Sequence, residues 1–360
     1  MSRSAAELWE KFCDDLKHAG AVLDRPTTPR DELTLAEGYR KLVRLVRVGF
    51  EAALEFADTE HPQIYQAVTS TGSGEGETSD ATYHQAFIDG AATYTVSGSR
   101  GQAPLIEFTV YAGKIGLQAA SRLIGALTEE DLTVGPDGSF EIVLSPEPHA
   151  GNWIRTEPAA SMLFIRQYAY DWTQVQGARF VIRKHDPGPT HPLGVEDLRI
   201  GLERTAGFVA QSAQFWAAVV DHNAAEPNVF HEIPAAPDPS RPTMPAGHRF
   251  AAGHFRLQPE EALAVTFTPI AVPYWGLQLT NYWFEPLAYG TPGSHVNNGT
   301  ARHEPDGSVR LIIADGPSDA PNWLDSRGHR EGPMIFRWSR TRAPLPVLTT
   351  RVVPRSILNH

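Results

Sequence analysis

The sequence predicts a mainly β protein, made of tandem β-sandwich or jelly-roll-like units with an N-terminal helical segment and a connecting helix. Three observations lead to this prediction. Short runs rich in β-branched and aromatic residues, separated by Gly, Pro and Asp-Gly, fill residues 81–184 and 248–360. Apolar residues recur at helical spacing near the N-terminus and within residues 193–225. The two β regions also share an ordered set of motifs.

Composition and charge exclude several classes of protein. The formal net charge of -11 argues against a nucleic-acid partner, which needs clustered Lys and Arg to displace phosphate counterions. Cys13 is the only cysteine, which excludes an internal disulfide framework and a multi-thiolate metal site. No apolar run approaches the roughly 18 residues of a membrane span. The N-terminus also lacks the apolar core of a signal peptide, so we expect a cytoplasmic protein.

The first 60 residues (1–60) are predicted to be helical. Ser4 and Glu7 have the spacing of a capping box, in which a hydroxyl and a carboxylate satisfy free amides at a helix start. Thr34 and Glu37 repeat this spacing before a second apolar helical face. A basic stripe beside that face, typical of a solvated surface, consists of Arg40, Arg44 and Arg47.

Four further segments complete the predicted organisation. A first β unit covers residues 81–184, and a connecting helix covers residues 193–225. Residues 226–247 are rich in proline and are expected to form an extended connector without packed structure. A C-terminal jelly-roll-like unit covers residues 248–360.

The most specific feature is an internal repeat between the two β regions. Each copy runs from an Asp-Gly-Ser turn through a buried strand to Asn-Trp, and then to an apolar strand that contains Arg. The matched positions are 137–139 with 306–308, 152–153 with 322–323, and Arg166 with Arg337. We interpret the repeat as a structural clamp that arose by duplication. In the alternative hypothesis one copy also lines a pocket, which makes Asn322 and Trp323 candidate substrate-binding residues.

A candidate acid–base cluster lies near the end of the second copy. His329 and Asp325 occupy the loop before the strand that contains Arg337. A histidine near a carboxylate can titrate near neutrality, as proton transfer requires. We therefore predict that His329, Asp325 and Arg337 are catalytic. The alternative is that the loop carboxylates, Asp325 among them, only cap turns.

Aromatic residues are dense in residues 274–284. In strand alternation Asn281 shares a side with apolar residues and needs a buried partner, for which a ligand is one candidate. Trp and Tyr stack on sugars and on flat hydrophobic molecules, although core packing is the favoured explanation for such residues. The complete set of predicted substrate-binding residues is Trp275, Asn281, Tyr282, Trp283, His295, Asn322 and Trp323.

The 14 histidines raise the question of a metal site. His185 and His191 are six residues apart, and so are His248 and His254. Neither pair has the spacing that brings ligands together on one helix or strand. We predict no cofactor and no metal ligands, and keep a divalent metal as the weaker alternative.

The motif set of the C-terminal third resembles a known family. It comprises Tyr-Trp and Asn-Tyr-Trp in YWGLQLTNYWFEPL (274–287), followed within residues 294–338 by Asp-Gly-Ser, Asn-Trp-Leu-Asp, Gly-His and Phe-Arg-Trp. These motifs, over residues 260–345, are similar to those of the bacterial domain-of-unknown-function family twelve-fourteen. Residues 85–185, with RQYAYDW at 166–172, resemble sequence found upstream in such proteins.

The resemblance implies jelly-roll β-sandwiches, often paired with a second β domain. It implies no established reaction, and therefore assigns no catalytic residues. The chain differs from longer secreted relatives of this family, in that its N-terminus does not read as a signal peptide.

We expect a cytoplasmic small-molecule enzyme: a cofactor-independent lyase, isomerase or hydrolase that acts on a hydroxylated organic substrate. Two alternatives stay open: a carbohydrate-binding or small-ligand-binding protein without turnover, and a structural β scaffold. An enzyme is favoured because bacterial-type chains of this length more often turn over a substrate than display a binding surface. The expected partners are a small-molecule ligand and a second copy in a homo-oligomer, with no nucleic acid.

Overall fold

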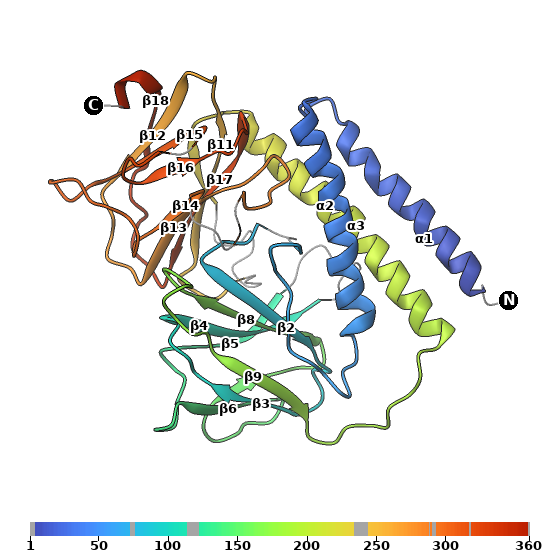
Figure 1. Ribbon diagram of the computed structural model, residues 1–360. Coiled ribbons are helices and arrows are strands. Elements are labelled where there is room, and N and C mark those ends of the chain that lie inside the picture. The colour runs from blue at the N-terminus through green and yellow to red at the C-terminus, as the bar shows by residue number, and fades with distance from the viewer. Residues whose placement is uncertain are drawn as a thin grey trace.

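A computed structural model describes residues 4–72, 76–113, 122–233, 244–287, 289, 293–316 and 318–358. Two β units lie one above the other, and three long helices run along one side of them (Figure 1). The long helix α3 leads from the end of the first unit to the start of the second. This arrangement confirms the predicted class: mainly β, in two similar units, with N-terminal helices and a connecting helix.

The N-terminal segment forms α1 (Ala5–Ala19), a short 3-10 turn η1 (Gly20–Asp24), α2 (Glu32–Phe50) and a π-helical turn η2 (Glu51–Glu55). The Ser4–Glu7 capping box is confirmed, because each residue accepts the other's backbone N–H. The second predicted cap is wrong. Asp31 caps α2 by accepting the Thr34 N–H at 2.9 Å, which leaves the Glu37 carboxylate free for another partner.

The connecting helix α3 spans Val195–Ala224, close to its predicted bounds. It packs against α1 through one apolar cluster and against the second β unit through another. The first cluster, against α1, contains Leu8, Phe12, Leu202 and Ala206. The second cluster, against the second β unit, contains Ala217, Val220, Tyr282, Trp283, Phe284 and Ile335.

The first β unit contains two sheets that enclose an apolar core. The five-stranded sheet has the order β1 (Tyr65–Gln66), β2 (Ala81–Phe87), β8 (Ala160–Tyr168), β4 (Leu105–Ala112) and β5 (Arg122–Thr128). The four-stranded sheet has the order β7 (Trp153–Arg155), β6 (Ser139–Ser145), β3 (Tyr94–Ser99) and β9 (Arg179–Lys184).

The second β unit repeats this layout around its own core. Its five-stranded sheet has the order β10 (Phe230–Ile233), β11 (Arg249–Arg256), β17 (Glu331–Ser339), β13 (Tyr274–Leu279) and β14 (His295–Asn297). Its four-stranded sheet has the order β16 (Trp323–Asp325), β15 (Val309–Ala314), β12 (Glu261–Phe267) and β18 (Thr349–Pro354), and a 3-10 turn η3 (Arg355–Leu358) follows.

The predicted connector is partly a strand. β10, within residues 226–247, pairs with β11, and Phe230 packs against the second core. An extended, proline-rich segment can still pair at the edge of a sheet, because an edge strand needs hydrogen bonds on one side only. Residues 234–243 of the connector lie outside the described residues.

The topology shows that the repeat extends over the whole of both units. Strand for strand, the order in the second unit equals that in the first, including the parallel pairs β6–β7 and β15–β16. The Asn-Trp motif makes equivalent contacts in both copies. Asn152 bridges the backbones of Thr133 and Glu141, and Asn322 bridges those of Arg302 and Arg310. Asn322 and Trp323 therefore belong to a repeated clamp, in which Trp323 Nε1 donates to the Gly316 carbonyl at 2.8 Å.

Candidate functional site

Polar residues from both β units meet where the two five-stranded sheets face each other. On β8, Ile165 points into the first core while Tyr168 points outward, and on β17 Phe336 points into the second core while Arg337 points outward. The rings of Tyr168 and Tyr274, one from each unit, lie 5.0 Å apart. We call this layer of outward-facing residues, which includes Tyr168, Tyr274 and Arg337, the inter-unit site.

The centre of the inter-unit site is the carboxylate of Asp80. The Tyr274 hydroxyl donates to Asp80 Oδ2 at 2.8 Å, and His295 Nε2 lies 3.3 Å from Asp80 Oδ1. The Asp80 side chain is 3% exposed and that of His295 is 15% exposed. His295 Nδ1 is buried and has no hydrogen-bond partner among the described residues. An imidazole held by a carboxylate at one nitrogen, with the other nitrogen unused, is the arrangement of a general base.

Local structure explains why these three groups converge. Asp80 directly precedes β2, and its carbonyl accepts the Ala169 N–H at 2.9 Å, which ties it to the end of β8. His295 opens β14, opposite Gln278 of β13. Gly276, two residues earlier on β13, has no side chain to fill the space above the sheet. A Cβ at Gly276 would overlap the Tyr274 hydroxyl and lie 3.3 Å from Asp80 Oδ2, so glycine makes room for the Asp80–Tyr274 contact.

Three buried tyrosines surround this centre. Burial raises the pKa of Tyr83, Tyr168 and Tyr274, against the opposing effect of the Arg337 positive charge. All three hydroxyls therefore stay protonated at neutral pH; that of Tyr274 donates to Asp80, and that of Tyr83 accepts the Thr78 N–H at 2.9 Å. The inter-unit site thus combines a carboxylate-held imidazole, neutral phenols and one guanidinium.

A second buried network lies on the same layer, centred on Glu107 of β4. Its carboxylate accepts from Arg166 at 2.9 Å and from Arg340 at 3.1 Å, and His248 Nε2 lies 2.8 Å away. Burial opposes ionisation of Glu107, but His248 and the two arginines outweigh it and lower its pKa well below the ordinary range. Arg340 also forms a fork of two bonds with Glu129. Because the partners come from both units, this network joins the two sheets.

The predicted catalytic cluster of His329, Asp325 and Arg337 is not assembled as expected. His329 Nε2 lies 2.8 Å from Glu37 Oε2 of α2, and its Nδ1 lies 2.8 Å from the Ser326 carbonyl. The Asp325 carboxylate instead accepts the N–H groups of Gly316 and Arg327, so it caps a turn. Of the three, Arg337 alone is part of the inter-unit site.

The Glu37–His329 pair predicts a stability that depends on pH. Burial opposes the charged imidazole, but the hydrogen bond and charge of Glu37 outweigh it, so the pKa of His329 lies above its ordinary value of 6.5. The stabilisation is therefore present below pH 6.5 and is lost as the pH rises through the raised pKa. Burial also opposes ionisation of Glu37, but His329 and Arg40 lower its pKa below 4.5, so the stabilisation fades as the pH falls below that value.

We therefore expect the free energy of unfolding of the wild type to exceed that of Glu37→Gln most strongly between pH 4.5 and 6.5. Urea unfolding over a pH series measures this difference. Glu32→Gln is the matched control, because Glu32 lies exposed on the same helix. A difference that grows steadily above pH 6.5 would contradict the pairing.

Most of the predicted substrate-binding aromatic residues are core residues. Trp275 is 2% exposed and stacks on Phe336 at a ring distance of 5.7 Å. Trp283 Nε1 donates to the Thr34 carbonyl at 2.7 Å, and the Tyr282 hydroxyl donates to the Thr27 carbonyl at 2.9 Å. Both residues therefore hold the N-terminal helical segment against the second unit.

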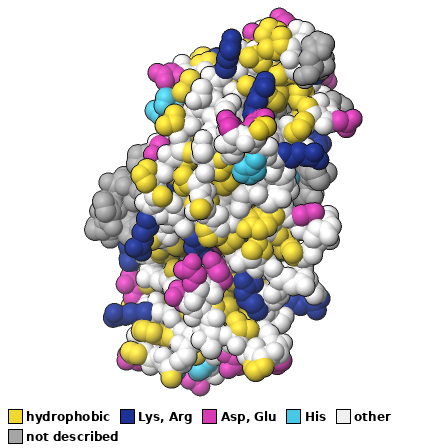
Figure 2. Space-filling view, turned by 90° about the vertical axis from the view of Figure 1, so that its left-hand side faces the viewer, with side chains coloured by type: hydrophobic (Ala, Val, Ile, Leu, Met, Phe, Trp, Pro, Cys, Tyr) yellow, Lys and Arg dark blue, Asp and Glu magenta, His cyan; other side chains and the backbone are white. Residues whose placement is uncertain are grey.

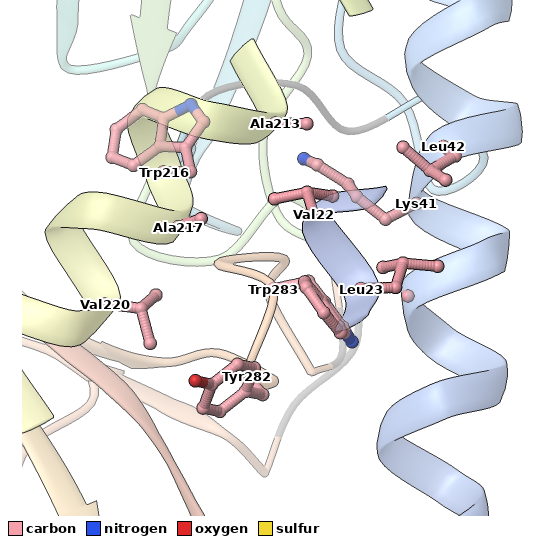
Figure 3. A pocket seen from close by; sticks show the side chains of 11 residues that line it. Val22, Leu23, Lys41, Leu42, Ala213, Trp216, Ala217, Val220, Tyr282 and Trp283 are labelled. Atoms are coloured by element: carbon pink, nitrogen blue, oxygen red, sulfur yellow. The ribbon is translucent and has the colours of Figure 1, made fainter. Parts of the chain in front are cut away.

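The cavity beside Tyr282 and Trp283 is too small for an organic substrate. It lies between α2, η1 and α3 and is lined by apolar side chains such as Leu23 and Val220 (Figure 3). Its volume of about 10 Å³ is close to the space of one water molecule, whereas ligand pockets occupy about 300–1,000 Å³.

The predicted partner of Asn281 is also supplied by the chain. Its Oδ1 accepts the N–H groups of Trp283 and Glu285 at 3.0 Å, and its Nδ2 donates to Glu285 Oε2 at 3.1 Å. The Glu285 carboxylate in turn pairs with Arg44 at 3.0 Å. Part of the basic stripe of α2 is therefore paired with the second unit and does not form a purely solvated face.

Within the described residues, no group of three or more His, Cys, Asp or Glu side chains has the geometry of a metal site. His248 and His254, which the sequence places six residues apart, pair separately with Glu107 and Glu331. The described helices also include none with the length and apolar character to cross a membrane. Charged side chains of both signs are interspersed over the face of the molecule in Figure 2.

Sequence interpretation missed Asp80, Tyr274 and Glu107. Glu107 carried a signal, because a lone carboxylate within the apolar strand LIEFTVY is as unusual as the arginine in LFIRQY, and both needed a buried partner. Asp80 carried none, since it ends a loop of small polar residues. Of the predicted residues, His295 and Arg337 do lie in the inter-unit site.

Comparison with known proteins places the chain in a family. The family model described as "Protein of unknown function (DUF1214)" matches residues 77–171. The match lies on the first β unit. The motifs that carry the family resemblance lie in residues 260–345 of the second unit, which repeats the strand order of the first.

A solved structure has the same architecture as this chain. An uncharacterized protein from Burkholderia cenocepacia, known from a crystal structure, is 32% identical in sequence to this chain. The alignment covers 98% of this chain and 98% of that protein, and the TM-score is 0.93. A structure from Vibrio parahaemolyticus is 10% identical, covers 94% of this chain and 100% of its own, and has a TM-score of 0.46. No curated protein matches the sequence. The chain belongs to the DUF1214 family of proteins of unknown function.

Proposed function

We propose that the protein is a small-molecule enzyme, a lyase, isomerase or hydrolase, which transfers protons without a bound cofactor. Its hydroxylated organic substrate binds at the inter-unit site. The observation that carries the proposal is the Asp80–His295 pair, whose imidazole has one buried nitrogen without a partner. A buried polar atom without a partner is costly, so a site that retains one is suited to receive a group from a ligand.

Each residue then has a definite role. In this proposal the imidazole proton is on Nε2, which faces Asp80, and Nδ1 is the proton acceptor. After proton transfer from the substrate, the carboxylate stabilises the imidazolium. The Tyr274 hydroxyl holds the second oxygen of Asp80 and fixes its orientation. Jelly-roll topology of the units, a cytoplasmic location and a homo-oligomer are parts of the same proposal.

The test is turnover of a library of hydroxylated organic compounds, followed by NMR and mass spectrometry. We expect the wild type to convert one class of compound, and His295→Ala to lower the rate at least about 100-fold. Asp80→Asn should also lower the rate, with a changed pH profile, because it removes the charge that supports the imidazolium.

His303→Ala is the matched control, since His303 is exposed and its hydrogen bond within the described residues is to the Gly307 carbonyl at 3.2 Å. Conversion by His295→Ala at the wild-type rate would refute the assigned base. A wild type that binds library members without converting them would refute the enzyme and favour a ligand-binding protein.

A further inference from the structure

Arg337 is a buried cation without a carboxylate partner in the described part of the chain. It is 6% exposed, and its Nη2 donates to the Gly76 carbonyl. Its Nη1 is buried and has no hydrogen-bond partner in the segments that the structure describes, and the guanidinium lies 6.0 Å from the centre of the Phe250 ring. Among the described residues no Asp or Glu oxygen lies within 4.0 Å of it.

The internal repeat supplies a matched comparison for this residue. Arg166 occupies the equivalent position of the first unit, and its cross-strand neighbour on β4 is Glu107, with which it forms a 2.9 Å ion pair. The cross-strand neighbour of Arg337 on β13 is Gly276. The second unit therefore has the arginine of the pair but lacks the carboxylate.

A buried guanidinium without an anionic partner destabilises a protein, because burial removes water and nothing replaces it. Arginine also presents a planar fork that binds a carboxylate through two parallel hydrogen bonds. An arginine that occupies this position without a carboxylate across the strand is suited to bind a carboxylate supplied from outside the chain.

We propose that Arg337 binds the carboxylate of a small organic acid at the inter-unit site. This inference deepens the proposed function and rests on it for the hydroxyl group: the substrate class becomes a hydroxy carboxylate, with the carboxylate at Arg337 and the hydroxylated carbon towards His295. Both residues lie on the same outward face of one sheet, separated by β13, where Gly276 adds no side chain.

The competing explanation is that Arg337 is neutralised at longer range by carboxylates of the chain. Asp80 and Arg337 both influence the pKa of Tyr274, and Glu77 and Arg337 both influence that of Tyr83. In that case Arg337 would have a structural role only, and it would not increase the affinity of the protein for a carboxylate ligand.

The experiment compares three probes by calorimetric titration at constant ionic strength: glycolate, which has a carboxylate and a hydroxyl; acetate, which lacks the hydroxyl; and glycolamide, which is neutral. We expect glycolate and acetate to bind the wild type at least about tenfold more tightly than glycolamide. Arg337→Gln should remove this preference, and Arg337→Lys should restore part of it.

Arg166→Gln is the matched control, because it removes the equivalent arginine that already has a partner; carboxylate binding should stay within about twofold of the wild type. Equal affinity of the wild type for glycolate and glycolamide would overturn the inference, even if Arg337 variants fail to fold. Carboxylate binding that is unchanged in Arg337→Gln would overturn it as well.

The two proposals fail in different ways. His295→Ala should keep acetate binding while it loses turnover. Carboxylate binding that depends on Arg337, together with turnover that is independent of His295, would support the carboxylate site and refute the proposed base.

Discussion

Replacing Glu107 by Gln should lower the free energy of unfolding by about 3–5 kcal/mol. Glu107 is fully buried, and its carboxylate is the shared acceptor for Arg166, His248 and Arg340. The amide of Gln has nearly the same shape but no charge, so it would remove the carboxylate that Arg166 pairs with and leave Arg340 with Glu129 alone. The loss is larger than that of a surface pair, because water cannot replace the missing charge.

Urea unfolding of Glu107→Gln against the wild type measures this loss. Glu141→Gln is the matched control, because it makes the same chemical change at an exposed position on β6, and we expect a change within about 0.5 kcal/mol. Equal losses in both variants would show that the Glu107 network does not join the two units. A separate unfolding transition for each unit in Glu107→Gln would strengthen the assignment.

Replacing Trp275 by Ala should also lower the free energy of unfolding by about 3–5 kcal/mol. Trp275 lies in the second core, stacked on Phe336 and in edge contact with Phe267 at 5.2 Å. Its removal deletes a large buried surface and leaves a cavity that the neighbouring rings fill only in part. The sequence suggested Trp275 as a substrate-binding residue, and this variant separates that hypothesis from a role in packing.

The measurement is again urea unfolding, with Trp9→Ala as the control. Trp9 is 59% exposed on α1, so the same substitution should cost much less there. A Trp275→Ala variant that is as stable as the wild type but has lost affinity for an organic ligand would contradict this prediction. Trp275 would then be a ligand-binding residue and not a core residue.

The two buried networks show how a duplicated sheet acquires different roles. The equivalent arginines, Arg166 and Arg337, both lie on the outward face of a five-stranded sheet. In the first unit the neighbouring Glu107 completes an ion network, while in the second Gly276 leaves space that Tyr274 and Asp80 use. One difference between the copies therefore separates a structural contact from the candidate site.

Local sequence predicted much of the fold. Apolar alternation indicated the strands, helical spacing indicated α3 almost to its bounds, and the Ser4–Glu7 spacing indicated the start of α1. The paired Asn-Trp motifs indicated the duplication, because Asn152 and Asn322 hold equivalent loops. All these signals depend on residues close together in the chain, where geometry follows from the periods of helix and strand.

The partners of the polar side chains could not be predicted in this way. His329 pairs with Glu37, and Tyr274 pairs with Asp80, across separations of hundreds of residues. The sequence by itself determined the class of fold, the repeat and the presence of an arginine within an apolar strand of each copy. Only the tertiary structure decided which charges meet, because the docking of one sheet against another sets those distances and no local pattern encodes that docking.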